Sequence, residues 1–181
     1  HRFASDADVV SCIKNDLGNA AGAPVQVLLH RLGTDVSSHT VDVNDAVLLD
    51  NIVITDPVFT PDRSLLICNP SVIHHARVVS HLFRSNCPIT AQPDWGSILI
   101  DYTGPQIDQA SLLRYVISYR QHEGFHEHCV EQIFQDLIAA CTPASLTVRI
   151  NFLRRGGLEI NPVRSLDKSM GMMVLPRLLR Q

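Results

Sequence analysis

Apolar residues spaced three and four positions apart predict two consecutive helices in the second half of the chain. The first helix can be capped by Asp108, and its apolar positions are Leu112, Leu113, Val116 and Ile117. The second follows Gly124, and its apolar positions are Val130, Ile133, Phe134, Leu137 and Ile138. Each stripe lies on one side of its helix, so we expect both helices to bury one face and expose the other.

Alternating apolar and polar residues predict strands on both sides of these helices. Residues 97–102 precede the helices, and residues 146–152 follow them. A turn over 154–157 and a second alternating run over 158–161 then predict a hairpin. Residues 71–84 fit a helix or a strand equally well. The order of strand, helix, helix and hairpin predicts an α+β fold in which the helices cover one face of an antiparallel sheet.

Weaker patterns describe the first half of the chain. Asp6 or Asp8 could cap a short helix that carries apolar residues up to Leu17. Two apolar runs, at residues 25–30 and 46–54, predict strands.

Composition narrows the possible functions. The chain has 181 residues and a net charge of −3, which argues against a general nucleic-acid-binding protein. No apolar run approaches the ~18 residues that a membrane-spanning helix needs. Charged residues make up only 18%, so we expect apolar surface that another subunit or a further part of the chain covers. The five cysteines, with no CxxC pair and no secretory signal, predict a reduced, cytoplasmic protein.

The sequence contains one motif that is typical of zinc hydrolases. Residues 122–126 match HExxH, in which two histidines on one helical face bind the metal. Gly124 interrupts the helix inside the motif, and no third ligand follows at the expected spacing. We therefore expect no metal site, and a zinc hydrolase remains the least favoured alternative.

A short loop with two prolines joins Cys87 to Asp94. A rigid loop can hold a nucleophile and an acid in a fixed relation, so the pair is a candidate catalytic site. The alternative is that Cys87 is a small buried apolar residue and that Asp94 is an ordinary turn residue.

Two further segments carry polar groups that suit a binding site. His126 and Glu127 fall in the first turn of the second helix, where free N–H groups favour anions. The turn Arg154–Gly157 combines arginines with glycines that let a phosphate approach the backbone. The alternatives are a polar helix terminus and an ordinary hairpin turn.

Together, these pieces resemble a known enzyme family. The stretches CPITAQPDWGSILIDYTGPQID, LLRYVISYRQHEGFHEHCVEQIFQDL and NFLRRGGLEINPVRS cover residues 84 to 165 almost without interruption. They are similar to the nitrile reductases that convert 7-cyano-7-deazaguanine to its aminomethyl form with NADPH, a step in making the queuosine base of tRNA. The resemblance implies the tunnelling fold, in which antiparallel sheets are each backed by two helices.

The resemblance also implies a role for each candidate residue. Cys87 would be the nucleophile that forms a covalent thioimide with the nitrile, and Asp94 would be the general acid. His126 and Glu127 would hold the substrate, and Arg155 with Gly156 would contact NADPH. The enzymes of this family act on the free base, so the resemblance implies no direct contact with nucleic acid.

Residues 1–83 match the family more loosely, as part of the N-terminal module of its longer, two-module form. Residues 84–181 would then form the C-terminal module, which carries the catalytic residues. A Glu-Ser-Lys-rich motif of the N-terminal module is not found, so we expect the N-terminal third to be absent from this chain. The alternative function is therefore a truncated, non-catalytic module that binds the base or acts as a scaffold. The fold also implies a homo-oligomer, for which a dimer is the simplest state.

A smaller hypothesis concerns a second thiol. Cys129 lies one helical turn after His126. If Cys87 points to the same place, a reversible disulfide could protect it from over-oxidation. The alternative is that Cys129 belongs to the core.

Overall fold

The structure is a computed structural model, and it describes residues 3–29 and 45–168. The chain separates into two compact units, residues 1–38 and 39–181. In the first unit, helix α1 runs from Asp6 to Ala21. Ser5 caps it by accepting a hydrogen bond from the backbone N–H of Asp8, and Gly22 ends it with φ 62°. The predicted helix is confirmed, with a cap one residue earlier than expected.

The strand predicted over residues 25–30 is wrong for residues 25–29, which form no regular element; residue 30 lies outside the described part. These residues have the apolar pattern of a strand. However, no described segment pairs with them, and a strand is stable only when its backbone groups have partners.

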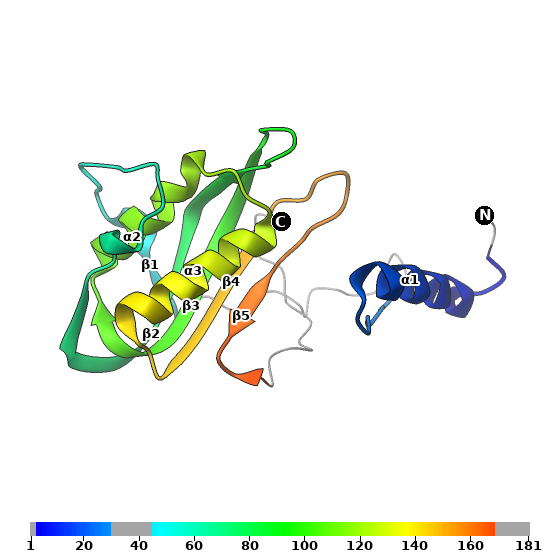
Figure 1. The fold of residues 1–181 in the computed structure, drawn as a ribbon, viewed down its shortest axis with the longest axis horizontal. Coiled ribbons are helices and arrows are strands. Elements are labelled where there is room, and N and C mark those ends of the chain that lie inside the picture. The colour runs from blue at the N-terminus through cyan, green and yellow to red at the C-terminus, as the bar shows by residue number, and fades with distance from the viewer. Residues whose placement is uncertain (1–2, 30–44, 169–181) are drawn as a thin grey trace. The chain divides into compact units, whose positions relative to one another are not determined.

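The second unit is built around a sheet, which two helices cover (Figure 1). The described residues contribute five strands, which lie side by side in chain order: β1 (Val47–Leu48), β2 (Cys68–Asn86), β3 (Pro93–Ile107), β4 (Ser145–Phe152) and β5 (Val163–Ser165). Strand β1 is parallel to β2, and the remaining neighbours are antiparallel. Residues 71–84, which fitted a helix or a strand by pattern, belong to the long strand β2.

Two strand predictions need correction. Of residues 46–54, only Val47 and Leu48 are a strand, and a 3₁₀ turn (Leu49–Asn51) follows. The Asp50 carboxylate in that turn accepts hydrogen bonds from the Ser80 hydroxyl and the His81 backbone N–H of β2, so a side chain replaces further backbone pairing.

Residues 158–161 are also not a strand. The Asn161 side chain accepts a hydrogen bond from the Phe152 backbone N–H, and pairing with β4 resumes only at β5. The turn before them is confirmed, because Gly156 and Gly157 have φ values of 57° and 84°.

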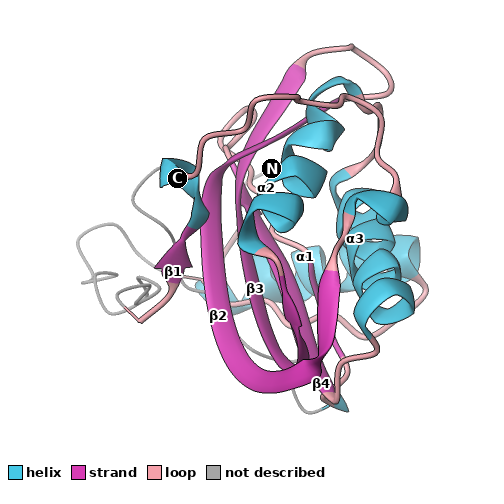
Figure 2. Ribbon diagram, turned by 90° about the vertical axis from the view of Figure 1, so that its left-hand side faces the viewer, coloured by secondary structure: helices cyan, strands magenta, loops and turns pink. Residues whose placement is uncertain are grey.

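Both predicted helices of the second half are confirmed. Helix α2 (Gln109–Ser118) begins after Asp108, whose carboxylate accepts a hydrogen bond from the Ser111 N–H at 2.8 Å. Helix α3 (His126–Cys141) follows a 3₁₀ turn, η4 (Tyr119–Gln121). Figure 2 shows α2 and α3 on the same side of the sheet. Their apolar stripes join the inward side chains of β3 and β4 in one core. The α+β prediction, with an antiparallel sheet backed by two helices, is therefore confirmed.

The boundary between the two expected modules, at residues 83 and 84, falls within β2. The division into two modules stays a proposal about the whole protein. No helix in the described ranges is long and apolar enough to cross a membrane.

Cysteine pairing differs from the expectation of a fully reduced chain. The structure joins Cys68, at the start of β2, to Cys141, at the end of α3, with their Cα atoms 5.9 Å apart. These residues are 73 positions apart in sequence. Counting and spacing cysteines could not show that the fold makes them neighbours. Cys12, Cys87 and Cys129 are free thiols.

Close packing between β3 and the loop after α3 leads to a stability prediction. A Cβ on Gly104 would lie 2.8 Å from the Cα of Pro143, a backbone atom that cannot move alone. We expect Gly104→Ala to lower the free energy of unfolding by about 1–3 kcal/mol, measured by urea denaturation. The control is Gly18→Ala in α1, where the nearest atom to the new Cβ is 3.6 Å away. An unchanged urea midpoint for Gly104→Ala would contradict the packing described.

Candidate active site

Cys87 is the first residue of the tight loop between β2 and β3. Its backbone N–H donates to the Gln92 carbonyl, and its carbonyl accepts from the Ala91 N–H, both at 2.9 Å. The register continues through Asn86 opposite Pro93 and Ser85 opposite Asp94. Hydrogen bonds on both sides of Cys87 therefore fix its position, as the two prolines suggested.

The surroundings of Cys87 favour its thiolate form. A hydrogen bond with the Thr90 side chain is the largest of the effects that lower the pKa of Cys87. Hydrogen bonds from the backbone of Ile89 and Thr90 and the positive charge of Arg155 act in the same direction. Because the thiolate is the nucleophilic form of cysteine, the loop prepares this thiol for attack on an electrophile.

The other two free thiols are not activated. Burial raises the pKa of Cys129 to about 11, and the charge of Asp16 raises the pKa of Cys12. Among the free cysteines, only Cys87 has a lowered pKa. The alternative that Cys87 is a small buried core residue does not fit, since it is partly exposed.

Asp94, near the start of β3, is the buried acid of the site. Its side chain is 6% exposed, and Oδ1 accepts a hydrogen bond from Nε of Arg155 at 2.6 Å. The same oxygen lies 3.4 Å from Nε2 of His126. An ordinary turn aspartate would be exposed. The burial of Asp94 beside an arginine and a histidine therefore favours a place in a functional site over an ordinary turn.

Arg155 connects the acid to the cysteine loop. Besides binding Asp94, its Nη1 donates to Oε1 of Gln92 at 3.1 Å and to Oγ1 of Thr90 at 3.5 Å. Its Nη2 donates to the Gln92 backbone carbonyl at 3.2 Å. The turn that presents Arg155 is closed by backbone hydrogen bonds between Arg155 and Leu158. One guanidinium therefore holds the loop and the carboxylate together.

His126 is the first residue of α3 and is held against the core. Its ring stacks on Phe152 with a centroid distance of 3.7 Å and an interplanar angle of 4°. Nδ1 is buried and has no hydrogen-bond partner among the described residues. The ring therefore has one nitrogen beside Asp94 and one that is enclosed and makes no hydrogen bond in the described part of the chain.

A backbone bridge brings the start of α3 to the cysteine loop. Asn86 donates its N–H to the His122 carbonyl at 2.8 Å, and Gly124 donates its N–H to the Asn86 carbonyl at 3.1 Å. A side chain on Gly124 would meet Nε2 of His122 at 2.8 Å. A larger residue at this position would therefore require the His122 ring to shift.

The same bridge separates the two histidines of the HExxH match. His122 is the C-cap residue of η4, whereas His126 is the first residue of α3. The two histidines therefore do not share a helical face. In the part of the chain that the structure describes, no group of three His, Cys, Asp or Glu side chains is placed to hold a metal ion.

The remaining candidates are Glu127 and Gly156. Each directly follows a residue already described, but their surroundings differ. Glu127 is exposed in the first turn of α3, directly after His126. Phe125, at the cap position, provides no side-chain hydrogen bond to that turn. Gly156 has positive φ, and a Cβ there would meet no atom within 4 Å, so its backbone is open to a ligand.

Sequence reasoning missed Thr90, Gln92 and Phe152. Thr90 and Gln92 lie inside the loop between Cys87 and Asp94, which was the only signal for them. Phe152 was assigned to a strand, and nothing in the pattern indicated that it stacks on a histidine from another element. The disulfide between Cys87 and Cys129 stays a hypothesis, since both thiols are free here.

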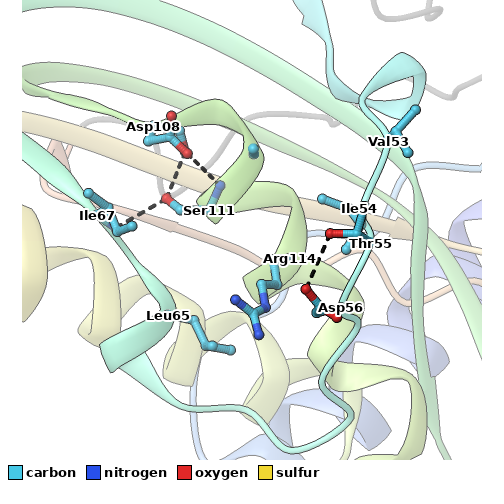
Figure 3. Close-up of a pocket in the computed structure, with 10 residues that line it drawn as sticks. Val53, Ile54, Thr55, Asp56, Leu65, Ile67, Asp108, Ser111 and Arg114 are labelled. Carbon is cyan, nitrogen blue, oxygen red and sulfur yellow. Dashed lines mark hydrogen bonds between the residues drawn. The ribbon is translucent and has the colours of Figure 1, made fainter.

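A separate cavity of about 250 Å³ lies at the opposite end of β3 (Figure 3). Its lining residues come from the 53–67 segment and the start of α2, and Figure 3 shows the Arg114 side chain extending between Leu65 and Asp56. The lining residues are Val53, Ile54, Thr55, Asp56, Leu65, Ile67, Asp108, Ala110, Ser111 and Arg114. None of the predicted site residues lines this cavity.

Comparison with known proteins shows which enzymes this chain is similar to. Residues 93–170 match the family described as QueF-like protein. The chain is 46% identical over 168 residues to the NADPH-dependent 7-cyano-7-deazaguanine reductase of Burkholderia orbicola, covering 91% of this chain and 60% of that protein. The reductases of Coxiella burnetii (46% identical, 91% and 58% covered) and Desulfotalea psychrophila (42%, 91% and 59%) are similar.

Among solved structures, the apo form of the archaeosine synthase QueF-Like is similar to this chain, with 22% identity and a TM-score of 0.45. The match covers 51% of this chain and 91% of that structure. The chain spans about three fifths of the length of the curated relatives it matches. The predicted resemblance is therefore confirmed: nine tenths of this chain is similar in sequence to the 7-cyano-7-deazaguanine reductases, and residues 93–170 match the family described as QueF-like protein.

Proposed function

We propose that this chain carries the catalytic residues of an NADPH-dependent reductase, which converts the nitrile of 7-cyano-7-deazaguanine to an aminomethyl group for queuosine synthesis. The observation that carries the proposal is the joint placement of a thiol with a lowered pKa and a buried carboxylate by Arg155. The names of the relatives supply the substrate and the cofactor.

The first step is addition of the Cys87 thiol across the nitrile. Sulfur forms a bond to the nitrile carbon, one π bond of the nitrile breaks, and the nitrogen receives a proton. The proton that Cys87 gives up passes to Asp94 and from there to the nitrogen, so the step balances and the product is a neutral covalent thioimide with no leaving group. A thioimide accepts hydride more readily than a nitrile does, which is the chemical reason for covalent catalysis here.

Asp94 is the group that delivers the proton to the nitrile nitrogen. Its carboxyl group is nearly enclosed, and it is oriented by Arg155 on one side and His126 on the other. Orientation by two partners keeps a proton donor at a fixed position, which general acid catalysis requires.

NADPH would supply the two hydrides when it is bound, and each hydride is matched by one proton. The C–S bond has to break after the first hydride, because the carbon cannot hold both added hydrogens while it stays bonded to sulfur. Cys87 leaves with a proton from the nitrogen, and the imine left behind takes up the second hydride and proton. Gly156 presents an open backbone on the turn next to Asp94, which suits a cofactor that must reach the thioimide.

His126 and Glu127 are proposed to hold the substrate. The exposed carboxylate of Glu127 can accept hydrogen bonds from the N–H edge of a guanine-like base, and the buried Nδ1 of His126 has no partner in the described part. A polar readout of this kind selects strongly against molecules that lack the N–H groups.

The assembly is also part of the proposal. We expect a cytoplasmic homo-oligomer, with a dimer as the simplest state, that acts on the free base without contacting nucleic acid. Several large apolar side chains of the first unit are exposed, including Leu28 and Leu29 at 55% and 47%, so this surface is available for such contacts.

Incubation with 7-cyano-7-deazaguanine without NADPH tests the nucleophile. We expect intact-mass spectrometry to show an increase equal to the whole nitrile, because addition releases nothing. Cys12→Ala should form the adduct, and Cys87→Ala should not. An adduct on Cys87→Ala, or none on the unmodified chain, would contradict the proposal. An adduct that NADPH does not convert to amine would instead favour the non-catalytic, base-binding alternative.

The hydrogen bond from Thr90 predicts a pH dependence. Its loss in Thr90→Val should raise the pKa of Cys87, so less thiolate is present at pH 7. We expect alkylation of Cys87 by iodoacetamide to be roughly threefold slower in Thr90→Val than in the unmodified chain at pH 7. At high pH the two rates should be equal, because Cys87 is ionised in both proteins. Thr90→Ser keeps the hydroxyl and is the control. Equal rates at pH 7 for the Val and Ser variants would remove Thr90 from this role.

The role of Asp94 predicts a loss that is specific to proton delivery. We expect Asp94→Asn to slow adduct formation by about 10²–10⁴. Iodoacetamide, which needs the thiolate but no acid, should still label Cys87 at a similar rate. The control is Asp101→Asn, on the same strand, where an exposed carboxylate pairs with His75. If Asp94→Asn forms the adduct as fast as the control, Asp94 is not the acid.

A further inference from the structure

Two arginines meet at one exposed tryptophan beside the proposed site. The guanidinium carbon of Arg84 lies 5.4 Å from the ring centroid of Trp95, and that of Arg120 lies 5.9 Å from it. The three residues come from β2, β3 and η4. Trp95 is 40% exposed, so the cluster is at the surface. We call these three residues the Trp95 cluster.

Neither guanidinium is neutralised by an acid in the described part of the chain. Arg84 donates from Nη2 to the side-chain oxygen of Asn86 at 3.0 Å. Arg120 donates from Nε and Nη2 to the backbone carbonyl of Leu82 at 3.4 and 3.2 Å. The ion pairs in the described ranges involve other residues. Two like charges therefore share one aromatic ring, and an anion between them would relieve their repulsion.

One of these donors is also left without a partner. Nε of Arg84 is buried and makes no hydrogen bond among the described residues. A buried donor without a partner costs free energy, so contacts within the described part of the chain do not satisfy this side chain fully. Guanidinium groups suit phosphate oxygens in particular, because their N–H groups can bind two oxygens at once.

Arg155 already makes contacts with an acid within the chain, whereas the two arginines of the Trp95 cluster make none in its described part. Its Nε binds Asp94, and its other two nitrogens bind Gln92 and Thr90. The arginine that the resemblance assigned to the cofactor is thus already paired with a carboxylate. A cofactor with several phosphate groups needs positive charge elsewhere near the site.

The Trp95 cluster is close enough to serve that purpose. Trp95 directly follows Asp94 in β3, and Arg84 is opposite Trp95 in the register with β2. Successive side chains of a strand point to opposite faces, so the cluster and Asp94 lie on the two sides of the same strand end. The cysteine loop begins three residues after Arg84, so the cluster adjoins the proposed site along the chain.

We propose that Arg84 and Arg120, supported by Trp95, form a phosphate-binding subsite for the nucleotide cofactor. This inference rests on the proposed function, since it assumes a cofactor with phosphate groups. Free phosphate or pyrophosphate has the same chemistry, so the experiment compares these ions with NADPH.

Direct binding tests the subsite without turnover. NADPH fluorescence is titrated with the full chain in the absence of nitrile, for the unmodified protein and for Arg84→Gln and Arg120→Gln. We expect each variant to raise the Kd for NADPH about tenfold, since each loses a charge-assisted hydrogen bond to phosphate. Added salt should weaken binding less in the variants. Arg63→Gln, which removes a charge from a distant 3₁₀ turn, is the matched control.

Two further readings keep the outcome clear. Thermal unfolding and circular dichroism show whether each variant is folded, and Arg84→Lys and Arg120→Lys, which keep the charge, should recover part of the affinity. Pyrophosphate should displace NADPH more effectively than inorganic phosphate does. An unchanged Kd in folded Gln variants overturns the subsite, as does NADPH that fails to bind while pyrophosphate still binds through the arginines.

The failure of the proposed function has a different signature. If the unmodified chain forms no covalent adduct with the nitrile but its NADPH affinity still depends on Arg84 and Arg120, the subsite stands and the nitrile chemistry fails. If the adduct forms and NADPH binding ignores both arginines, the nitrile chemistry stands and the subsite fails.

Discussion

The guanidinium of Arg155 is the interaction on which the proposed site depends. It binds the Asp94 carboxylate at 2.6 Å and, through Gln92 and Thr90, the loop that begins at Cys87. Asp94 is nearly fully buried, and a buried carboxylate without a cation is strongly unfavourable. The arginine therefore stabilises the buried carboxylate and, through its further contacts with Gln92 and Thr90, sets the position of Asp94 relative to the loop of Cys87. It also adds to the effects that lower the pKa of Cys87.

The elements that support this contact were largely predictable from the sequence. The periodicity of apolar residues identified α2 and α3, and the resemblance identified Cys87, Asp94, His126 and Arg155 as one set. Predictions failed where a side chain takes over from backbone pairing. Asp50 satisfies the backbone of β2 after only two residues of β1, and Asn161 does the same for β4. Single apolar patterns carry no information about such long-range polar partners.

The detailed geometry of the site was beyond sequence reasoning for a related reason. Neither the stack of His126 on Phe152 nor the clip from Arg155 to Gln92 has a local signal, because the partners lie 26 and 63 positions apart. Loops and turns place these side chains, and their positions follow from tertiary packing rather than from propensity. Residues 25–29 show the converse, since their apolar pattern is clear while no described partner strand completes it.

The order of the site residues along the chain has a consequence for how the site is made. Cys87 and Asp94 are synthesised first. His126 follows after α2, at the start of α3, and Arg155 comes last, after β4. A nascent chain that has not yet reached the turn after β4 contains Asp94 and the loop of Cys87. It still lacks Arg155, which binds both of them. The proposed site therefore forms only when the last of its four residues has left the ribosome. A chain that stops short of this turn has three of the residues but lacks the one that holds them together.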